Sequence, residues 1–154
     1  MSTSRLAGRV RSARAVAVAL LHGHKLKFHK KGKDGSGKCD AEYTNDARDV
    51  VYGVVFEMSR LEKPILDSKE GLHRGYREKK VSLVTQAGET MEAMTYYATS
   101  IEPVLRPFEW YREHVLRGAR EHGLPAEYIA AIEAVEALPD PDKGRHEREL
   151  AIYR

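Results

Sequence analysis

The sequence lacks the features that would place it in a membrane or in an oxidising compartment. It has a single cysteine, Cys39, so no disulfide can form within the chain, and the reducing cytoplasm is the expected location. The longest apolar run, residues 13–21, contains Arg14 and is well short of the roughly 20 residues that cross a bilayer. No small-residue cleavage site follows that run, so a signal peptide is not expected either.

The chain also lacks an excess of either charge. Its 154 residues carry a formal net charge of +3 with 32% charged side chains, which is ordinary for a globular protein. The basic residues of the first forty positions are not interleaved with aromatics as a nucleic-acid surface would require. They are Arg5, Arg9, Arg11, Arg14, Lys25, Lys27, Lys30, Lys31, Lys33 and Lys38. We therefore expect solvated charge and no nucleic-acid partner.

The hydrophobic pattern predicts one domain over residues 1–154, with strands first and helices later. Strands are expected at 13–21, 25–30, 50–58, 79–85 and 90–99, and the third of these, rich in valine, is expected to be buried on both faces. Helices are expected at 107–122 and 125–138, with shorter ones near 3–10 and 61–70, and residues 140–154 form either a short helix or a loose tail. This order indicates an α+β fold with an antiparallel or barrel-like sheet.

A glycine-rich stretch offers one alternative function. Residues 32–38 match seven positions of the phosphate-binding pattern G-x-x-x-x-G-K-[ST], but Cys39 occupies the eighth, where a hydroxyl should bind the metal. No helix pattern follows the stretch. We interpret it as a surface loop.

Two further alternatives concern metal binding and a cysteine nucleophile. His22 and His24 share one strand face while His29 points the other way, and no second group of ligands is found. Cys39 has no base that the sequence singles out to activate it. We therefore interpret the histidines as ordinary turn and strand residues, and we do not expect Cys39 to be a nucleophile.

Several short motifs, taken together and in order, resemble a known family. They are Arg5-Leu6 to Ala13-Arg14, the strand Val51 to Phe56, Leu66-Asp67 to Glu70-Gly71, Gly75-Tyr76, Tyr96, Pro107 to Tyr111, Gly118-Ala119, Gly123-Leu124-Pro125 and Tyr128. Single pieces are weak, but their joint order over nearly the whole chain is specific. The sequence resembles the γ-glutamylcyclotransferase-like proteins.

The resemblance implies a small mixed β-barrel or sheet with flanking helices and a cavity for a γ-glutamyl group. It implies an enzyme that cyclises a γ-glutamyl amine or peptide to 5-oxoproline and releases the amine or amino acid, a reaction that requires neither a metal nor an organic cofactor. Glu70 matches the family's catalytic acid/base, and Gly71, Tyr76 and Tyr111 match substrate-binding positions. The small-molecule substrate would be the main partner, and the resemblance also implies a possible homodimer.

The family's first strand and its Y-G-S-N motif, whose backbone amides hold the glutamyl carboxylate, are not found in the sequence. Met1 aligns directly after this motif and is counted with the substrate-binding residues. Either the strand and motif lie before Met1, or the family's site is incomplete here. In the second case the chain would be a catalytically silent binding module of the same fold.

Overall fold

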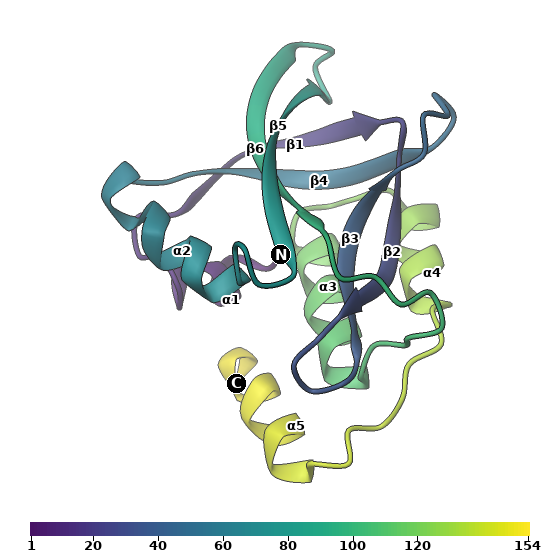
Figure 1. Cartoon of the computed structure of the whole chain (residues 1–154). Helices are drawn as coiled ribbons and strands as arrows, with labels where there is room; N and C mark the ends of the chain where they lie inside the picture. Colours follow the sequence, from purple (N-terminus) through teal and green to yellow (C-terminus); the bar gives the residue numbers. More distant parts are fainter.

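The computed structural model describes all residues from 1 to 154 (Figure 1). Six strands are present: β1 (Arg14–His22), β2 (His24–Lys31), β3 (Gly37–Tyr43), β4 (Val50–Glu57), β5 (Tyr76–Thr85) and β6 (Thr90–Ala98). Five α-helices are present: α1 (Thr3–Ala7), α2 (Lys63–Glu70), α3 (Glu109–Glu121), α4 (Ala126–Glu133) and α5 (Lys143–Leu150). Two 3-10 turns, η1 (Arg60–Glu62) and η2 (Ala151–Tyr153), extend α2 and α5.

The strands form two antiparallel sheets. Four of them pair in the order β4-β1-β5-β6, and β2 pairs only with β3. The α+β class predicted from the sequence is therefore confirmed. The sheets do not close into a barrel, because β4 and β6 both remain edge strands of an open sheet.

One strand prediction needs correction, and one strand was missed. The valine-rich β4 is not buried on both faces, since its residues are half-buried along an edge of the four-stranded sheet. The strand β3 was not predicted at all, because its sequence is short and polar. It forms because β2 offers an adjacent strand, with pairs from His24↔Tyr43 to Lys31↔Gly37. Pairing overrides the weak local preference of these residues.

The main hydrophobic core lies between the β2–β3 ribbon and the helices α3 and α4, which stand behind it in Figure 1. Its fully buried members are Phe28, Leu116, Ala119, Leu124 and Ile132. A second, smaller core lies on the four-stranded sheet around Ala19, Leu21 and Leu83. Because the main core combines a residue of β2 with residues of α3 and α4, the first strands and the late helices belong to one domain.

The helical half largely follows the sequence prediction. Helix α3 ends before Gly123, whose φ of +63° suits the left-handed cap, and the Leu124 N–H donates to the Ala119 carbonyl at 3.0 Å. Helix α4 is shorter than predicted and ends at Glu133. None of the helices is both long and apolar enough to cross a membrane.

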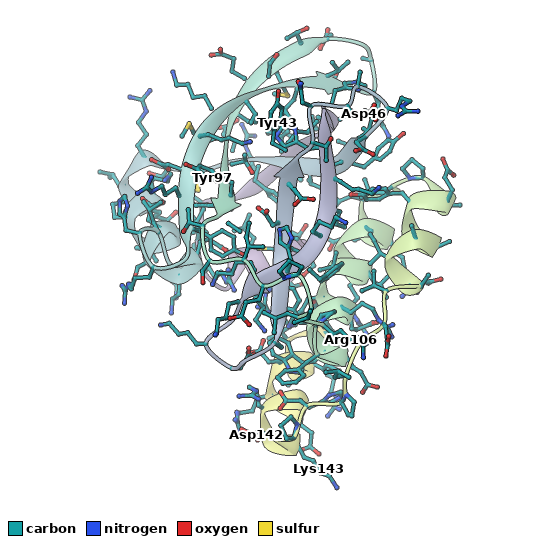
Figure 2. The ribbon with its side chains drawn as sticks, turned by 45° about the vertical axis from the view of Figure 1, so that its right-hand side comes forward. Tyr43, Asp46, Tyr97, Arg106, Asp142 and Lys143 are labelled. Atoms are coloured by element: carbon teal, nitrogen blue, oxygen red, sulfur yellow. The ribbon has the colours of Figure 1, made fainter.

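The C-terminal segment is a docked helix and not a loose tail. Its first turn is capped by Asp142, at the bottom of Figure 2, whose carboxylate accepts a hydrogen bond from the Arg145 N–H at 2.9 Å. At its other end Glu149 pairs with Arg5 at 2.9 Å, which joins α5 to the N-terminal segment. The open alternative at residues 140–154 is thus resolved in favour of the helix.

Candidate active site around Glu70

The sequence places Glu70 at a sharply defined helix end. It is the last residue of α2, and Gly71 follows in the left-handed conformation with φ of +76° and ψ of 42°. The Leu72 N–H donates to the Asp67 carbonyl at 2.9 Å, which closes the last turn of the helix. Glycine adopts this conformation without the steric cost of a Cβ, so Gly71 determines where the helix stops and where Glu70 points.

The loop after Gly71 turns the chain tightly into β5. Gly75 has φ of +112°, and His73 also has positive φ, at +63°, which is uncommon for a residue with a side chain. The His73 N–H donates to the Tyr76 carbonyl at 2.8 Å. Such backbone conformations persist where the surrounding structure enforces them. Here they bring the first residue of β5, Tyr76, back toward the end of α2.

The helix that carries Glu70 is held against β6 by polar contacts. The Tyr96 hydroxyl donates to Asp67 Oδ1 at 2.5 Å, and Lys63 pairs with the same carboxylate. Lys63 also pairs with Glu78 of β5 at 2.6 Å. The network fixes α2 to the sheet one turn before Glu70, so the position of the candidate carboxylate depends on the sheet as well as on the helix.

Glu70 is paired with Arg9, a residue that sequence reasoning counted only as a surface charge. The guanidinium donates to Glu70 Oε1, and the two side chains are 21% and 19% exposed. Arg9 reaches this place because α1 is followed by the fully buried Val10, which anchors the segment. The carboxylate is therefore held by a cation in a partly shielded environment, where such a pair is stronger than on the open surface.

Tyr76 and Tyr111 meet at the backbone of Cys39. The Tyr76 hydroxyl donates to the Cys39 carbonyl at 2.7 Å, and the Tyr111 hydroxyl accepts from the Cys39 N–H at 3.1 Å. Burial raises the pKa of both phenols, and the nearby negative charge of Glu70 adds to the effect. Both therefore remain protonated.

Met1 lies at the same end of the molecule. A Cβ added to Gly118 of α3 would lie 2.7 Å from the Met1 carbonyl carbon, so this glycine allows the chain to pass close to the helix. Desolvation lowers the pKa of the α-amine, while the charges of Cys39, Glu121 and Glu70 act in the opposite direction. The amine thus lies within electrostatic range of the Glu70 carboxylate.

Lys30 is a second cation that sequence reasoning placed on the surface. It is only 8% exposed and has no ion pair, and its ammonium lies 4.7 Å from the centre of the Tyr76 ring. A Cβ at Gly75 would lie 2.9 Å from Lys30 Cε, so Gly75 makes room for this side chain. Burial lowers the pKa of the Lys30 ammonium. The only sign of this burial in the sequence is that Lys30 follows Leu26 and Phe28 at every second position, which predicts the same face of a strand.

The alternative sites of the sequence analysis do not form. Burial raises the pKa of the Cys39 thiol to about 12, which leaves it protonated and unreactive. The glycine-rich stretch leads into β3 instead of a helix, and its Lys38 pairs with Asp34 at 2.7 Å within the loop. The ammonium of Lys38 also lies 4.6 Å from the centre of the Trp110 ring. This lysine is part of the fold's packing and is not directed at a phosphate.

The three histidines of the metal alternative are separated. His22 and His24 flank a turn at Gly23, and His24 Nδ1 is 2.8 Å from the His22 carbonyl oxygen. The other ring nitrogen of His24 lies 2.8 Å from Lys79 Nζ, and that ammonium lies 5.7 and 5.6 Å from the centres of the Tyr43 and Tyr97 rings, both labelled in Figure 2. His29 instead pairs with Asp40. No group of three ligating side chains in the chain could hold a metal ion.

Comparisons with known proteins agree with this arrangement of elements. The model of the AIG2-like family matches residues 50–132. Human gamma-glutamylcyclotransferase is 32% identical over 152 residues, which is 96% of this chain and 79% of the human protein. This chain belongs to the γ-glutamylcyclotransferase-like family.

Other relatives of this γ-glutamylcyclotransferase-like chain extend the match. The bovine gamma-glutamylcyclotransferase is 34% identical over 103 residues, so the match spans 66% of this chain and about half, 53%, of the bovine protein. A solved structure described as a gamma-glutamyl cyclotransferase superposes with a TM-score of 0.87 at 28% identity, covering 99% of this chain and 92% of that one. Glu70, Gly71, Tyr76 and Tyr111 lie inside the matched family region, whereas Met1, Arg9 and Lys30 lie outside it.

Proposed function

We propose that this protein cyclises γ-glutamyl amines or peptides to 5-oxoproline, with Glu70 as the general acid/base. The observation that carries the proposal is the cluster at the end of α2, where Glu70 lies with Arg9, Tyr76 and Lys30 in a chain of this family. A partly shielded carboxylate beside two protonated phenols and two cations is suited to a substrate that carries an ammonium, a carboxylate and an amide.

The reaction needs little more than positioning and proton transfer. The α-amine of the γ-glutamyl group attacks its own γ-carbonyl carbon, a five-membered ring closes, and the bond to the leaving nitrogen breaks. Because the nucleophile and the electrophile belong to one molecule, folding the substrate into the attack geometry supplies much of the rate enhancement. Glu70 takes a proton from the ammonium before the attack and gives it to the leaving nitrogen as the C–N bond breaks. The second proton that the ring nitrogen loses on forming the lactam follows the same route, so the amine leaves as an ammonium and the carboxylate ends as it began.

The charges around Glu70 suggest how the substrate is held. In the free protein Arg9 donates to the Glu70 carboxylate, and the substrate's ammonium has to share or replace this contact before Glu70 accepts a proton. Lys30, a buried ammonium without an acidic partner, is a suitable contact for a substrate carboxylate, because an unpaired buried charge is costly. Binding of the zwitterionic γ-glutamyl group would thus give Lys30 an acidic partner and place the ammonium at Glu70.

Tyr111 has a separate part in the proposal. Its hydroxyl oxygen accepts from the Cys39 N–H, and in this proposal its hydrogen turns from the Cys39 sulfur to donate to the oxygen of the γ-carbonyl. That oxygen gains negative charge as the ring closes, and a donor placed in advance stabilises it more in the transition state than in the ground state. Tyr76, which donates to Cys39, holds β3 in position beside Glu70. Met1 and Gly71 lie at the edge of the same region.

The test measures 5-oxoproline released from γ-glutamylalanine and from a γ-glutamyl alkylamine. We expect turnover by the wild-type protein and a decrease of kcat of about a hundredfold to ten-thousandfold for Glu70→Gln, because this amide transfers no protons. Glu149→Gln is the matched control, since Glu149 also pairs with an arginine, Arg5, but lies on α5. Absence of product from the wild type, or equal rates for Glu70→Gln, would disprove the proposal.

No observation favours the alternative in which the chain is a catalytically silent binding module. A location in the reducing cytoplasm and assembly into a homodimer accompany the proposed function. Sedimentation of the purified protein over a range of concentrations measures the oligomeric state, and a monomer at all of them would remove the dimer from the proposal.

A further inference from the structure

A buried histidine and aspartate form a pair that the proposed function does not use. His29 Nε2 lies 2.9 Å from Asp40 Oδ2, and these side chains are only 8% and 4% exposed. The other Asp40 oxygen accepts a hydrogen bond from the Ala98 N–H at 2.8 Å. An ionised carboxylate can only accept hydrogen bonds, so His29 Nε2 is the donor to Asp40, and in this tautomer Nδ1 carries a lone pair.

A β-bulge directs His29 to this position. Lys27 pairs with Asp40 and Lys30 pairs with Lys38, so β2 has one residue more than β3 between these two pairs. The extra residue disturbs the strict alternation of the strand, and Phe28 and His29 are both buried as a result. Bulges of this kind re-aim side chains, and here the bulge puts the imidazole beneath a hollow in the surface.

This hollow, which we call the β2 hollow, has a volume of about 400 Å³. His29 and Glu42 are among its polar lining residues, and its apolar wall includes Leu105, Pro107 and Val135. It lies between β2, the segment that follows β6 and the segment that follows α4, near Arg106 in Figure 2. None of the residues of the Glu70 cluster lines it. Its volume is in the range of small-molecule sites, which combine apolar walls with a few polar groups.

The unpartnered nitrogen of His29 defines the ligand chemistry. Nδ1 makes no hydrogen bond within the protein, and Glu42 Oε1 lies 3.9 Å from it, too far for a direct one. Two acceptors at this separation can both be reached by one ammonium group at hydrogen-bond lengths of about 2.8 Å. A single hydroxyl offers only one hydrogen, and a carboxylate would be repelled by Glu42.

We propose that the β2 hollow binds a small molecule that carries an ammonium group on an apolar body. The ammonium donates to His29 Nδ1 and to Glu42, and the apolar body contacts Leu105, Pro107 and Val135. Two kinds of molecule share this chemistry, simple alkylamines and amino acids with apolar side chains. For an amino acid, Lys27, which also lines the hollow and has no ion pair, is available for the carboxylate. This site does not depend on the proposed cyclotransferase activity.

The test uses calorimetric titration of the full chain with three ligands of one branched apolar body: 3-methylbutylamine, leucine and 4-methylpentanoate. We expect the amine to bind and the carboxylate not to bind. Leucine that binds at least as tightly as the amine identifies amino acids as the ligand class, and leucine that does not bind identifies simple amines. Failure of both ammonium compounds to bind overturns the proposal.

Two variants locate the binding. Glu42→Gln removes the charged acceptor, and we expect affinity for the amine to fall about tenfold. His29→Gln retains an N–H that can donate to Asp40 but offers nothing at the position of Nδ1, and a decrease of similar size is expected. The exposed residues His22 and Glu89 supply the controls, as His22→Gln and Glu89→Gln. Unchanged affinity in both hollow variants, or an equal loss in the controls, overturns the proposal.

A spectroscopic readout checks the same contact without a variant. In the wild-type protein the ¹⁵N resonance of His29 Nδ1 should move on addition of 3-methylbutylamine, because the nitrogen begins to accept a hydrogen bond. The Nε2 resonance, already tied to Asp40, should move less. A resonance of Nδ1 that stays unchanged at saturation contradicts the assigned contact.

Discussion

Two arginine–glutamate pairs of this protein look alike in their chemistry and differ in what surrounds them. Arg5 pairs with Glu149 and Arg9 pairs with Glu70, and both arginines come from the N-terminal segment. Each glutamate lies at or near the end of a short helix, α5 or α2. The side chain of Glu149 is 34% exposed and that of Glu70 is 19% exposed.

The Glu149 pair is saturated by further partners. His114 Nε2 lies 3.1 Å from Glu149, and Tyr153 and then Ser2 continue the chain of hydrogen bonds at 2.7 and 2.9 Å. The His114 hydrogen bond and the Arg5 guanidinium lower the pKa of Glu149 to about 2. Such a carboxylate is fixed as an anion and ties the two ends of the chain together. Glu70 has only Arg9, which leaves acceptor positions for a substrate.

The largest expected difference between the two pairs is in activity, when each arginine is replaced in turn. Arg9→Met should lower kcat/KM for γ-glutamylalanine about tenfold, because Glu70 loses the contact that orients its carboxylate. Arg5→Met should leave kcat/KM within about twofold, since its partner lies on α5. Steady-state kinetics of both variants, with circular dichroism to verify folding, measure the difference. Equal losses of kcat/KM in the two variants would show that the Arg9–Glu70 pair contributes no more to activity than the Arg5–Glu149 pair.

A smaller effect is expected on stability. Glu149→Gln should reduce the free energy of unfolding by about 1 kcal/mol, because Arg5 and His114 lose a charged acceptor that is partly screened by solvent. Urea unfolding followed by tryptophan fluorescence measures this, since Trp110 is buried on α3. A variant as stable as the wild type would show that the contact contributes nothing to the attachment of α5.

The smallest effect is the pH dependence of that contribution. The pKa of Glu149 is lowered from 4.5 to about 2 in the folded protein, so its stabilisation is present above the unfolded pKa of 4.5 and is lost as pH falls toward 2. The difference in unfolding free energy between wild type and Glu149→Gln should therefore shrink over this window. A difference that stays constant, or grows, as the solution is acidified contradicts the assigned pKa direction.

Much of the fold could be predicted because the decisive signals are local. The periodicity of residues 107–122 and the cap at Gly123 gave α3, and Pro64 was correctly placed in the first turn of α2. The strand β3 could not be predicted, because its polar residues become a strand only when β2 lies beside them. The double burial expected for β4 was wrong because hydrophobic content does not reveal a strand's place in the sheet.

The same distinction applies to the site. By itself the sequence determined that Glu70 precedes a glycine at a helix end and that a turn leads from there through Tyr76 into a strand, because both features depend on neighbouring residues. Only the tertiary structure decided which charges meet there. Arg9 is 61 residues from Glu70 in the chain, and Lys30 reaches the site from a bulged strand. Contacts across such separations follow from the packing of whole elements, and no local pattern encodes them.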